Sequence, residues 1–173
     1  MQALAYWKAV TRDRADFLDE FLSMLADNGI RYCVIGGQGV NAYAEPLVSL
    51  DLDVAGAAED FDTVKQLLPA RFRVERFEHS LNISTPDSQL RVQIQTDPRY
   101  AAFVPRAMPR DVLGMTLPVA AVEDVLQGKL WAFLDETRRA TKRQKDLADI
   151  GRLIEAYPHL RERVPREVLD RLV

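Results

Sequence analysis

The chain has 173 residues, of which 47% are hydrophobic and 28% charged, enough apolar content for one domain with a sizeable core. Its formal net charge of −3 excludes a globally basic nucleic-acid binder, so any such role depends on a local patch. The single cysteine excludes an internal disulfide, and no apolar run reaches membrane-spanning length. Because no signal peptide is visible, we expect a cytoplasmic protein with no membrane partner.

The first half of the chain alternates between helical and strand-like patterns. Residues 11–28 predict an amphipathic helix whose apolar stripe includes Phe17 and Phe21 and whose end is marked by Asn28-Gly29. A buried strand follows at residues 31–35, then a Gly-Gly turn and a second apolar strand at residues 50–55. The next predicted elements are a helix over 59–68, ended by Pro69, and strands over 72–77, 81–84 and 90–95.

The second half is mainly helical. A short segment opens at Asp97-Pro98, and residues 112–119 predict a weak extended region broken by Gly114 and Pro118. Helices are expected over residues 122–135 and 141–157, with one more short helix after Pro165. The pattern predicts a small α/β (α+β) domain, with a core over 1–119 and a helical part of the same domain over 120–173.

The Gly36-Gly37 turn and the Asp51/Asp53 pair carry the chemistry. Residues i and i+2 of a strand share a face, so both carboxylates point one way while Leu50, Leu52 and Val54 point into a core. Paired carboxylates repel unless a cation lies between them, and Mg²⁺ prefers carboxylates together with substrate phosphates. The backbone N–H groups of a Gly-Gly turn suit phosphate. These features indicate a magnesium–nucleoside triphosphate site; the alternative is that both aspartates are strand-edge charges.

Lys129 falls within the apolar stripe of the helix over 122–135. It either extends to a nearby edge or reaches into a polar site, where it would hold a triphosphate. In the next helix, Lys142–Asp146 and Lys145–Asp149 have the spacing of ordinary surface pairs. The basic run around them is either a solvated face or a contact for triphosphate or RNA backbone.

A Gly-Gly turn, a Ser-x-Asp-x-Asp strand, a helix lysine and a Lys-Asp-x-x-Asp helix occur in this order. They resemble the minimal nucleotidyltransferases of the DNA polymerase-beta superfamily. Within it, segments 93–100, 126–129 and 142–150 are similar to the AbiEii/AbiGii toxin-like nucleotidyltransferases. The resemblance covers about residues 15–157.

The resemblance implies a mixed sheet flanked by helices, with the Asp-x-Asp strand beside the Gly-Gly turn. It also implies transfer of a nucleoside monophosphate from an NTP to an RNA (tRNA-like) or protein acceptor, as the toxin of a pair with a cognate antitoxin. Asp51 and Asp53 would bind Mg²⁺ or Mn²⁺, and Asp146 would be a base or an orienting carboxylate. The nucleotide-binding residues would be Gly36, Gly37, Ser49, Lys129 and Lys145.

Two positions depart from that pattern. Gln93 stands where many superfamily members carry a third metal-binding carboxylate, and Leu47 replaces an arginine that many relatives have two residues before Ser49. Either Asp146 supplies the missing acid, or activity is weak, or it is gone. The alternative to an active enzyme is therefore a non-catalytic nucleotide- or partner-binding module that kept the fold.

Overall fold

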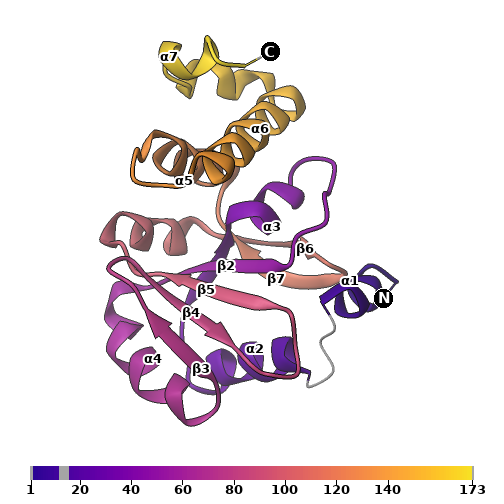
Figure 1. The fold of residues 1–173 in the computed structure, drawn as a ribbon, viewed down its shortest axis with the longest axis vertical. Helices are drawn as coiled ribbons and strands as arrows, with labels where there is room; N and C mark the ends of the chain where they lie inside the picture. Colours follow the sequence, from indigo (N-terminus) through magenta and orange to yellow (C-terminus); the bar gives the residue numbers. More distant parts are fainter. Residues whose placement is uncertain (1, 12–15, 173) are drawn as a thin grey trace.

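The computed structural model describes residues 2–11 and 16–172, and within them a mixed sheet of seven strands forms the centre of the molecule (Figure 1). The strand order is β3-β4-β5-β2-β1-β7-β6. β2 pairs with β5 and β1 with β7 in parallel, and the other neighbouring strands are antiparallel. The strands are β1 Tyr32–Ile35, β2 Asp51–Gly56, β3 Arg73–Arg76, β4 Ser80–Ser84, β5 Arg91–Gln95, β6 Met108–Val112 and β7 Met115–Val119.

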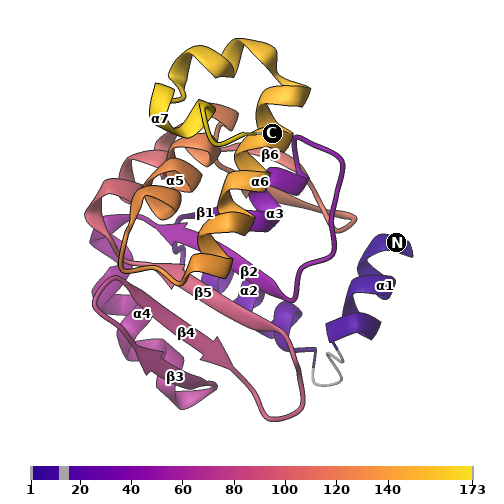
Figure 2. The same cartoon turned by 45° about the horizontal axis from the view of Figure 1, so that its top comes forward.

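Helices pack on both faces of this sheet. A mixed sheet flanked by helices confirms the predicted fold class. Figures 1 and 2 show α5, α6 and α7 gathered at one end of the molecule and α2 and α4 at the other. The α-helices are α1 Gln2–Thr11, α2 Phe17–Asp27, α3 Gly36–Asn41, α4 Phe61–Leu67, α5 Val122–Leu134, α6 Ala140–Ala156 and α7 Arg166–Leu169. Short 3-10 helices are η1 Ala58–Asp60, η2 Leu68–Ala70, η3 Pro98–Arg106 and η4 Pro158–Arg163. Within residues 2–11 and 16–172, none of the helices has the length and apolarity needed to cross a bilayer.

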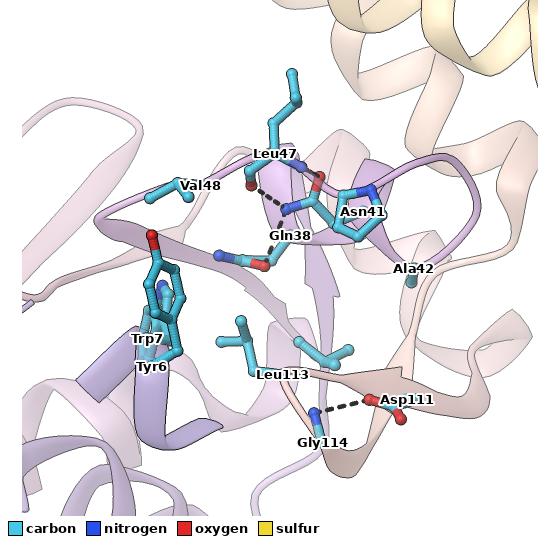
Figure 3. A pocket seen from close by; sticks show the side chains of 12 residues that line it. Tyr6, Trp7, Gln38, Asn41, Ala42, Leu47, Val48, Asp111, Leu113 and Gly114 are labelled. Carbon is cyan, nitrogen blue, oxygen red and sulfur yellow. Dashed lines mark hydrogen bonds between the residues drawn. The ribbon is translucent and has the colours of Figure 1, made fainter. Parts of the chain in front are cut away.

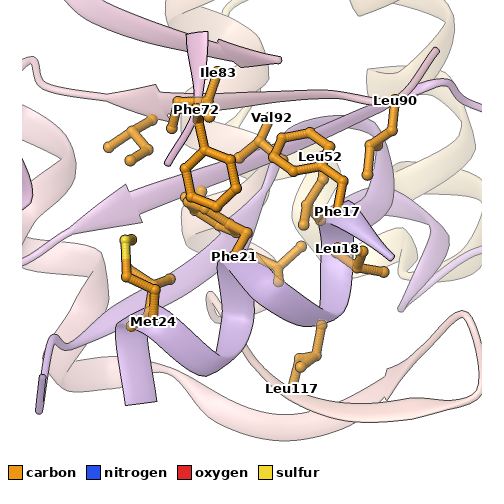
Figure 4. Close-up of a cluster of buried hydrophobic side chains, with 14 of the residues drawn as sticks. Phe17, Leu18, Phe21, Met24, Leu52, Phe72, Ile83, Leu90, Val92 and Leu117 are labelled. Atoms are coloured by element: carbon orange, nitrogen blue, oxygen red, sulfur yellow. The ribbon is translucent and has the colours of Figure 1, made fainter. Parts of the chain in front are cut away.

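Helix α2 closes the core on one face of the sheet. Its apolar residues recur at helical spacing, so Phe17 and Phe21 point together against Phe72 and the strands (Figure 4). The helix ends where predicted, because Gly29 adopts a positive φ of 62° and lets Ile30 N donate back to Leu25 O. This core includes Leu52 and Val54 from β2.

A second core lies on the opposite face, under α3, α5 and α6. It includes Cys33 and Ile35 of β1 and Ala55 of β2, packed against Leu126 and Ile150. Strand β2 therefore contributes alternate residues to two cores. The same alternation directs Asp51 and Asp53 towards the α5–α6 side, away from α2.

Three details differ from the sequence expectation. The helix expected over 11–28 is described as α2 from residue 17 on; Thr11 ends α1, and residues 12–15 of the expected helix lie outside the described residues. Leu50 is 36% exposed and not in the core, because it precedes the first paired residue of β2. The helix predicted over 59–68 is shorter, with 3-10 turns at both ends of α4.

The region 112–119 is the second half of a β-hairpin. Its first strand, β6, begins at Met108, and the turn falls at Leu113 and Gly114, which both have positive φ. The strand was missed because Met108-Pro109-Arg110-Asp111 shows no apolar alternation. Its pairing with β7 compensates for this weak local preference.

Candidate active site

Gly36 joins β1 to α3 at the base of the site. Its φ is 64°, in the left-handed region, and a Cβ at this position would lie 2.2 Å from Oδ2 of Asp53. Both the backbone conformation and the close approach therefore require glycine. Gly37 differs, since the nearest atom to a Cβ there would be Ser49 Oγ at 3.8 Å.

Asp51 and Asp53 project from β2, which lies between β1 and β5 in the middle of the sheet. The reading of these two residues as strand-edge charges is therefore wrong. Asp51 Oδ1 accepts a hydrogen bond of 3.1 Å from Arg91 Nε on the adjacent β5. Burial raises the pKa of Asp53 to about 6; the charge on Lys129 opposes this rise and that on Asp51 adds to it.

These carboxylates lie in an open cleft of about 250 Å³ between the sheet and the α5–α6 pair. A cavity of about 80 Å³ adjoins it, shares Asp53, Gln93 and Lys129, and adds Gly36. Five cationic side chains line the cleft against three carboxylates, so it carries an excess of positive charge that suits a phosphate ligand. The cleft is lined by Gly37, Ser49, Asp51, Asp53, Asn82, Arg91, Val92, Gln93, Lys129, Arg138, Lys142, Lys145 and Asp146.

Lys129 is buried between α5 and α6, with 7% of its surface exposed. Its Nζ lies 3.1 Å from Asp146 Oδ1 and 2.8 Å from Asp149 Oδ2. Burial disfavours the ammonium, but the two carboxylates outweigh this and raise the pKa of Lys129. The lysine is therefore held charged at the wall of the cleft.

Both acidic residues of α6 have further cationic partners. Arg138 Nε donates to Asp146 Oδ2 at 2.7 Å, and Arg152 Nη1 donates to Asp149 Oδ1 at 2.8 Å. The reading of Lys142–Asp146 and Lys145–Asp149 as ordinary surface pairs is therefore wrong, because both aspartates are buried and pair with Lys129 instead. Helical spacing alone does not reveal that a neighbouring helix covers this face.

All eight residues predicted from sequence for the site meet in this region. Seven of them line the cleft, and Gly36 lines the adjoining cavity and contacts Asp53. The sequence reasoning missed Arg91 and Asn82 as site residues. It placed Lys142 in a surface pair with Asp146 and in a basic run, and Arg138 in that basic run alone. The signal for Arg91 was its place two residues before Gln93, on the strand that pairs with β2.

Gln93 lies directly beside Asp53 in the β2–β5 register. Its amide thus stands where a third carboxylate would complete a set of acidic ligands, and no group of three or more His, Cys, Asp or Glu positioned to hold a metal ion is found within residues 2–11 and 16–172. Two carboxylates on one face still offer the hard oxygen ligands that Mg²⁺ takes when water and phosphate complete its shell. The donor set therefore fits a magnesium ion that arrives with a nucleotide.

Solved structures share the fold at low sequence identity. Antibiotic-resistance factor ANT(2'')-Ia in complex with adenylyl-2''-tobramycin superimposes with a TM-score of 0.58 and 11% identity, over 87% of this chain and 98% of that one. The lincomycin-bound lincosamide antibiotic adenylyltransferase LnuA gives a TM-score of 0.53 and 13% identity, over 79% and 95%. An antigenic nucleotidyltransferase-like protein from Paracoccidioides brasiliensis gives a TM-score of 0.50 and 16% identity, over 86% of this chain and 75% of that one. These similarities support the fold alone.

The sequence itself matches a family. No curated protein sequence matches the chain. Residues 6–172 match the family described as nucleotidyl transferase AbiEii toxin of type IV toxin–antitoxin systems. Since the match spans nearly the whole chain and agrees with the fold, the protein belongs to the AbiEii nucleotidyltransferase toxin family.

Proposed function

We propose that the cleft binds a magnesium–nucleoside triphosphate and transfers its nucleoside monophosphate to a hydroxyl group of an acceptor. The observation that carries this proposal is the convergence of Asp51, Asp53 and five cationic side chains in one cleft. Membership of the AbiEii family supports the reaction class and a role as the toxin of a pair with a cognate antitoxin. A triphosphate substrate also favours a cytoplasmic location.

Asp51 and Asp53 would hold the metal ion through their carboxylate oxygens. When bound, Mg²⁺ neutralises the phosphates and polarises the α-phosphate. Arg91 contacts only Oδ1 of Asp51, and its exposed guanidinium lies where it would also bind phosphate. Ser49 Oγ and the Gly37 N–H would orient the phosphate chain, with Lys145 at the rim of the cleft.

In the transfer step the acceptor oxygen bonds to the α-phosphorus, and the bond from that phosphorus to the oxygen bridging to the β-phosphate breaks. Pyrophosphate leaves with the electron pair, and the hydroxyl proton passes to solvent or to a base. Both oxygens of Asp146 are bound by Lys129 and Arg138, which favours an orienting role for this residue over that of a base. The fixed charge of Lys129 would stabilise the negative charge that builds on the phosphates.

The acceptor best supported by the charge of the cleft is RNA. Arg91, Arg138, Lys142 and Lys145 form a basic rim that would contact a phosphate backbone. Two fold neighbours were solved with antibiotics, ANT(2'')-Ia with adenylyl-2''-tobramycin and LnuA with lincomycin, so a small hydroxyl-bearing molecule is the comparison to include. The experiment also includes cell protein, because the acceptor can be a protein.

The experiment incubates the protein with each α-³²P-labelled NTP, Mg²⁺ or Mn²⁺, and total RNA, cell protein or tobramycin. We expect label in RNA from the α-labelled but not the γ-labelled nucleotide, and none with Asp51→Asn. The matched control is Asp62→Asn, an exposed carboxylate on α4, which keeps full transfer. Transfer that survives in a folded Asp51→Asn variant would contradict the proposal.

The second candidate is a non-catalytic nucleotide- or partner-binding module, and Gln93 beside Asp53 is the observation that favours it. It predicts binding of an NTP, or of a partner protein, without labelled product under any metal condition. Gln93→Glu would then place a third carboxylate beside Asp53 and is expected to restore transfer. Label in any acceptor with the wild-type protein excludes this candidate.

A further inference from the structure

A second cavity, of about 910 Å³, lies between α1, the segment over 46–48 and the β6–β7 turn (Figure 3). We call it the Trp7 cavity. Its volume is in the range of sites that enclose small organic ligands. It has no lining residue in common with the cleft, although Gln38 follows Gly37 and Val48 precedes Ser49. The two hollows therefore share α3 and the segment before β2, but different residues of these segments line each one, and their other walls come from different elements.

Gln38 provides an unsatisfied hydrogen-bond donor at this cavity. The residue is 1% exposed, and its Oε1 accepts a bond of 3.3 Å from Asn41 Nδ2. Its Nε2 is buried and has no hydrogen-bond partner within the described residues. Figure 3 shows the amide extending between Leu47 and Leu113 towards Trp7. A buried donor without a partner is costly, so a ligand with an acceptor oxygen would be favoured here.

The walls define the rest of the ligand. Tyr6, Trp7, Val48 and Leu113 offer aromatic and apolar surface, with Tyr6 61% and Val48 60% exposed. No lysine or arginine is among the lining residues, and the one charged side chain there is Asp111. The cavity thus disfavours phosphates and other anions. It suits an uncharged molecule with an aromatic body.

The walls are held in place before any ligand arrives. Asn41 Nδ2 donates to Leu47 O at 2.7 Å, and Leu47 N donates to Asn41 Oδ1 at 2.9 Å. Trp7 Nε1 donates to Ser49 O at 2.5 Å, which ties α1 to the same segment. A preformed cavity requires little ordering when it binds.

We propose that the Trp7 cavity is a second ligand site, separate from the cleft, for a small uncharged aromatic molecule with a carbonyl acceptor that Gln38 Nε2 recognises. This site does not depend on nucleotidyl transfer.

The test uses 4-fluoroacetanilide, which has both features, and follows its ¹⁹F line width during titration of the full chain. We expect saturable binding with a Kd of about 1 mM or tighter. The analogue 4-fluoroethylbenzene, which lacks the carbonyl, should bind about three- to tenfold more weakly. Equal binding of the two probes, or no saturable binding of either, would overturn the proposal.

Variants locate the binding. Gln38→Met keeps the side-chain volume without the donor and should weaken 4-fluoroacetanilide about three- to tenfold. Val48→Trp, at a 60% exposed position beside Tyr6 (Figure 3), should fill the opening of the cavity and abolish binding. The matched control Gln66→Met, at an exposed position of α4, should bind the probe like the wild type. Asp51→Asn in the cleft should also bind the probe like the wild type. Unchanged binding in Val48→Trp, or loss of binding in Asp51→Asn, would show that the probe binds elsewhere and would overturn the proposal.

Discussion

Gly36 lies so close to Asp53 that a Cβ at position 36 would overlap the carboxylate. The turn places Gly36 directly against the Asp53 carboxylate, so the two positions constrain each other. The register explains this contact, because Ile35 of β1 pairs with Asp53 of β2 and Gly36 is the next residue. Backbone geometry at one residue thus determines where a proposed metal ligand lies.

Gly36→Ala should destabilise the fold, whereas Gly37→Ala should not. Alanine at position 36 must adopt a positive φ, which costs roughly 1–2 kcal/mol, and its Cβ would also displace Asp53. Alanine at position 37 has room and should change stability by less than about 1 kcal/mol. Urea denaturation compares the two variants. Equal stability of both would show that the turn tolerates a side chain.

Asp53→Asn should stabilise the protein without metal at pH 7.5. The pKa of Asp53 rises from 3.8 to about 6 on folding, so the folded state loses stability as pH rises through this window. Removing the charge should recover up to about 3 kcal/mol at pH 7.5 and almost nothing at pH 4. Urea denaturation in EDTA at both pH values measures the free energy of unfolding of each variant. The control Asp62→Asn, at an exposed position, should differ from the wild type by less than about 0.5 kcal/mol. A gain that is the same at both pH values would contradict it.

Period-two alternation was enough to predict that Asp51 and Asp53 share a face. It failed for Leu50, because alternation does not say where pairing begins. Arg91 was missed for a related reason: its contact with Asp51 depends on the register between two strands 40 residues apart in sequence. Such long-range register is not encoded in a local pattern.

Helices α5 and α6 are joined through the buried Lys129. The lysine contacts two aspartates one helical turn apart on α6, and Arg138 and Arg152 neutralise their remaining oxygens. Arg152 also donates to Asn41 Oδ1 at 2.8 Å, which ties α6 to α3. The charges therefore fix the position of both helices relative to the sheet.

Lys129→Met should cost roughly 3 kcal/mol of unfolding free energy, because it leaves two buried carboxylates short of a cation. Thermal and urea unfolding measure the effect, with Lys65→Met on α4 as the control, expected within about 0.5 kcal/mol of wild type. A cost below about 1 kcal/mol would show that Lys129 is not the buried link between the helices.

Many elements could be predicted from the periodicity of their apolar residues, which is strong in α2. The strand β6 could not, since its order comes from the hairpin partner rather than from its own residues. The burial of Asp146 and Asp149 was also missed. A polar helix face gives the same sequence pattern whether it meets solvent or the lysine of a neighbouring helix.

At the scale of the whole molecule, one strand serves two cores and one site. Leu52 and Val54 anchor β2 on the α2 side, Ala55 joins the core under α5 and α6, and Asp51 and Asp53 open into the cleft. The fold class was predicted from the succession of helical and strand-like patterns, and the family from the order of four motifs. The division of the chain at residues 119 and 120 and the roles of the site residues stay predictions.

The most direct test of the account is calorimetric titration with the four α,β-methylene nucleoside triphosphates, which cannot be cleaved between the α- and β-phosphates. We predict that at least one of these nucleotides binds the wild-type protein in Mg²⁺ but not in EDTA. Its affinity should be at least tenfold lower for Asp51→Asn and unchanged for Asp62→Asn. An active enzyme requires this result, and so does a non-catalytic module that binds nucleotide. The proposed magnesium–nucleotide site would be contradicted if nucleotide affinity did not depend on Mg²⁺ or on Asp51, or if no nucleotide bound the folded protein.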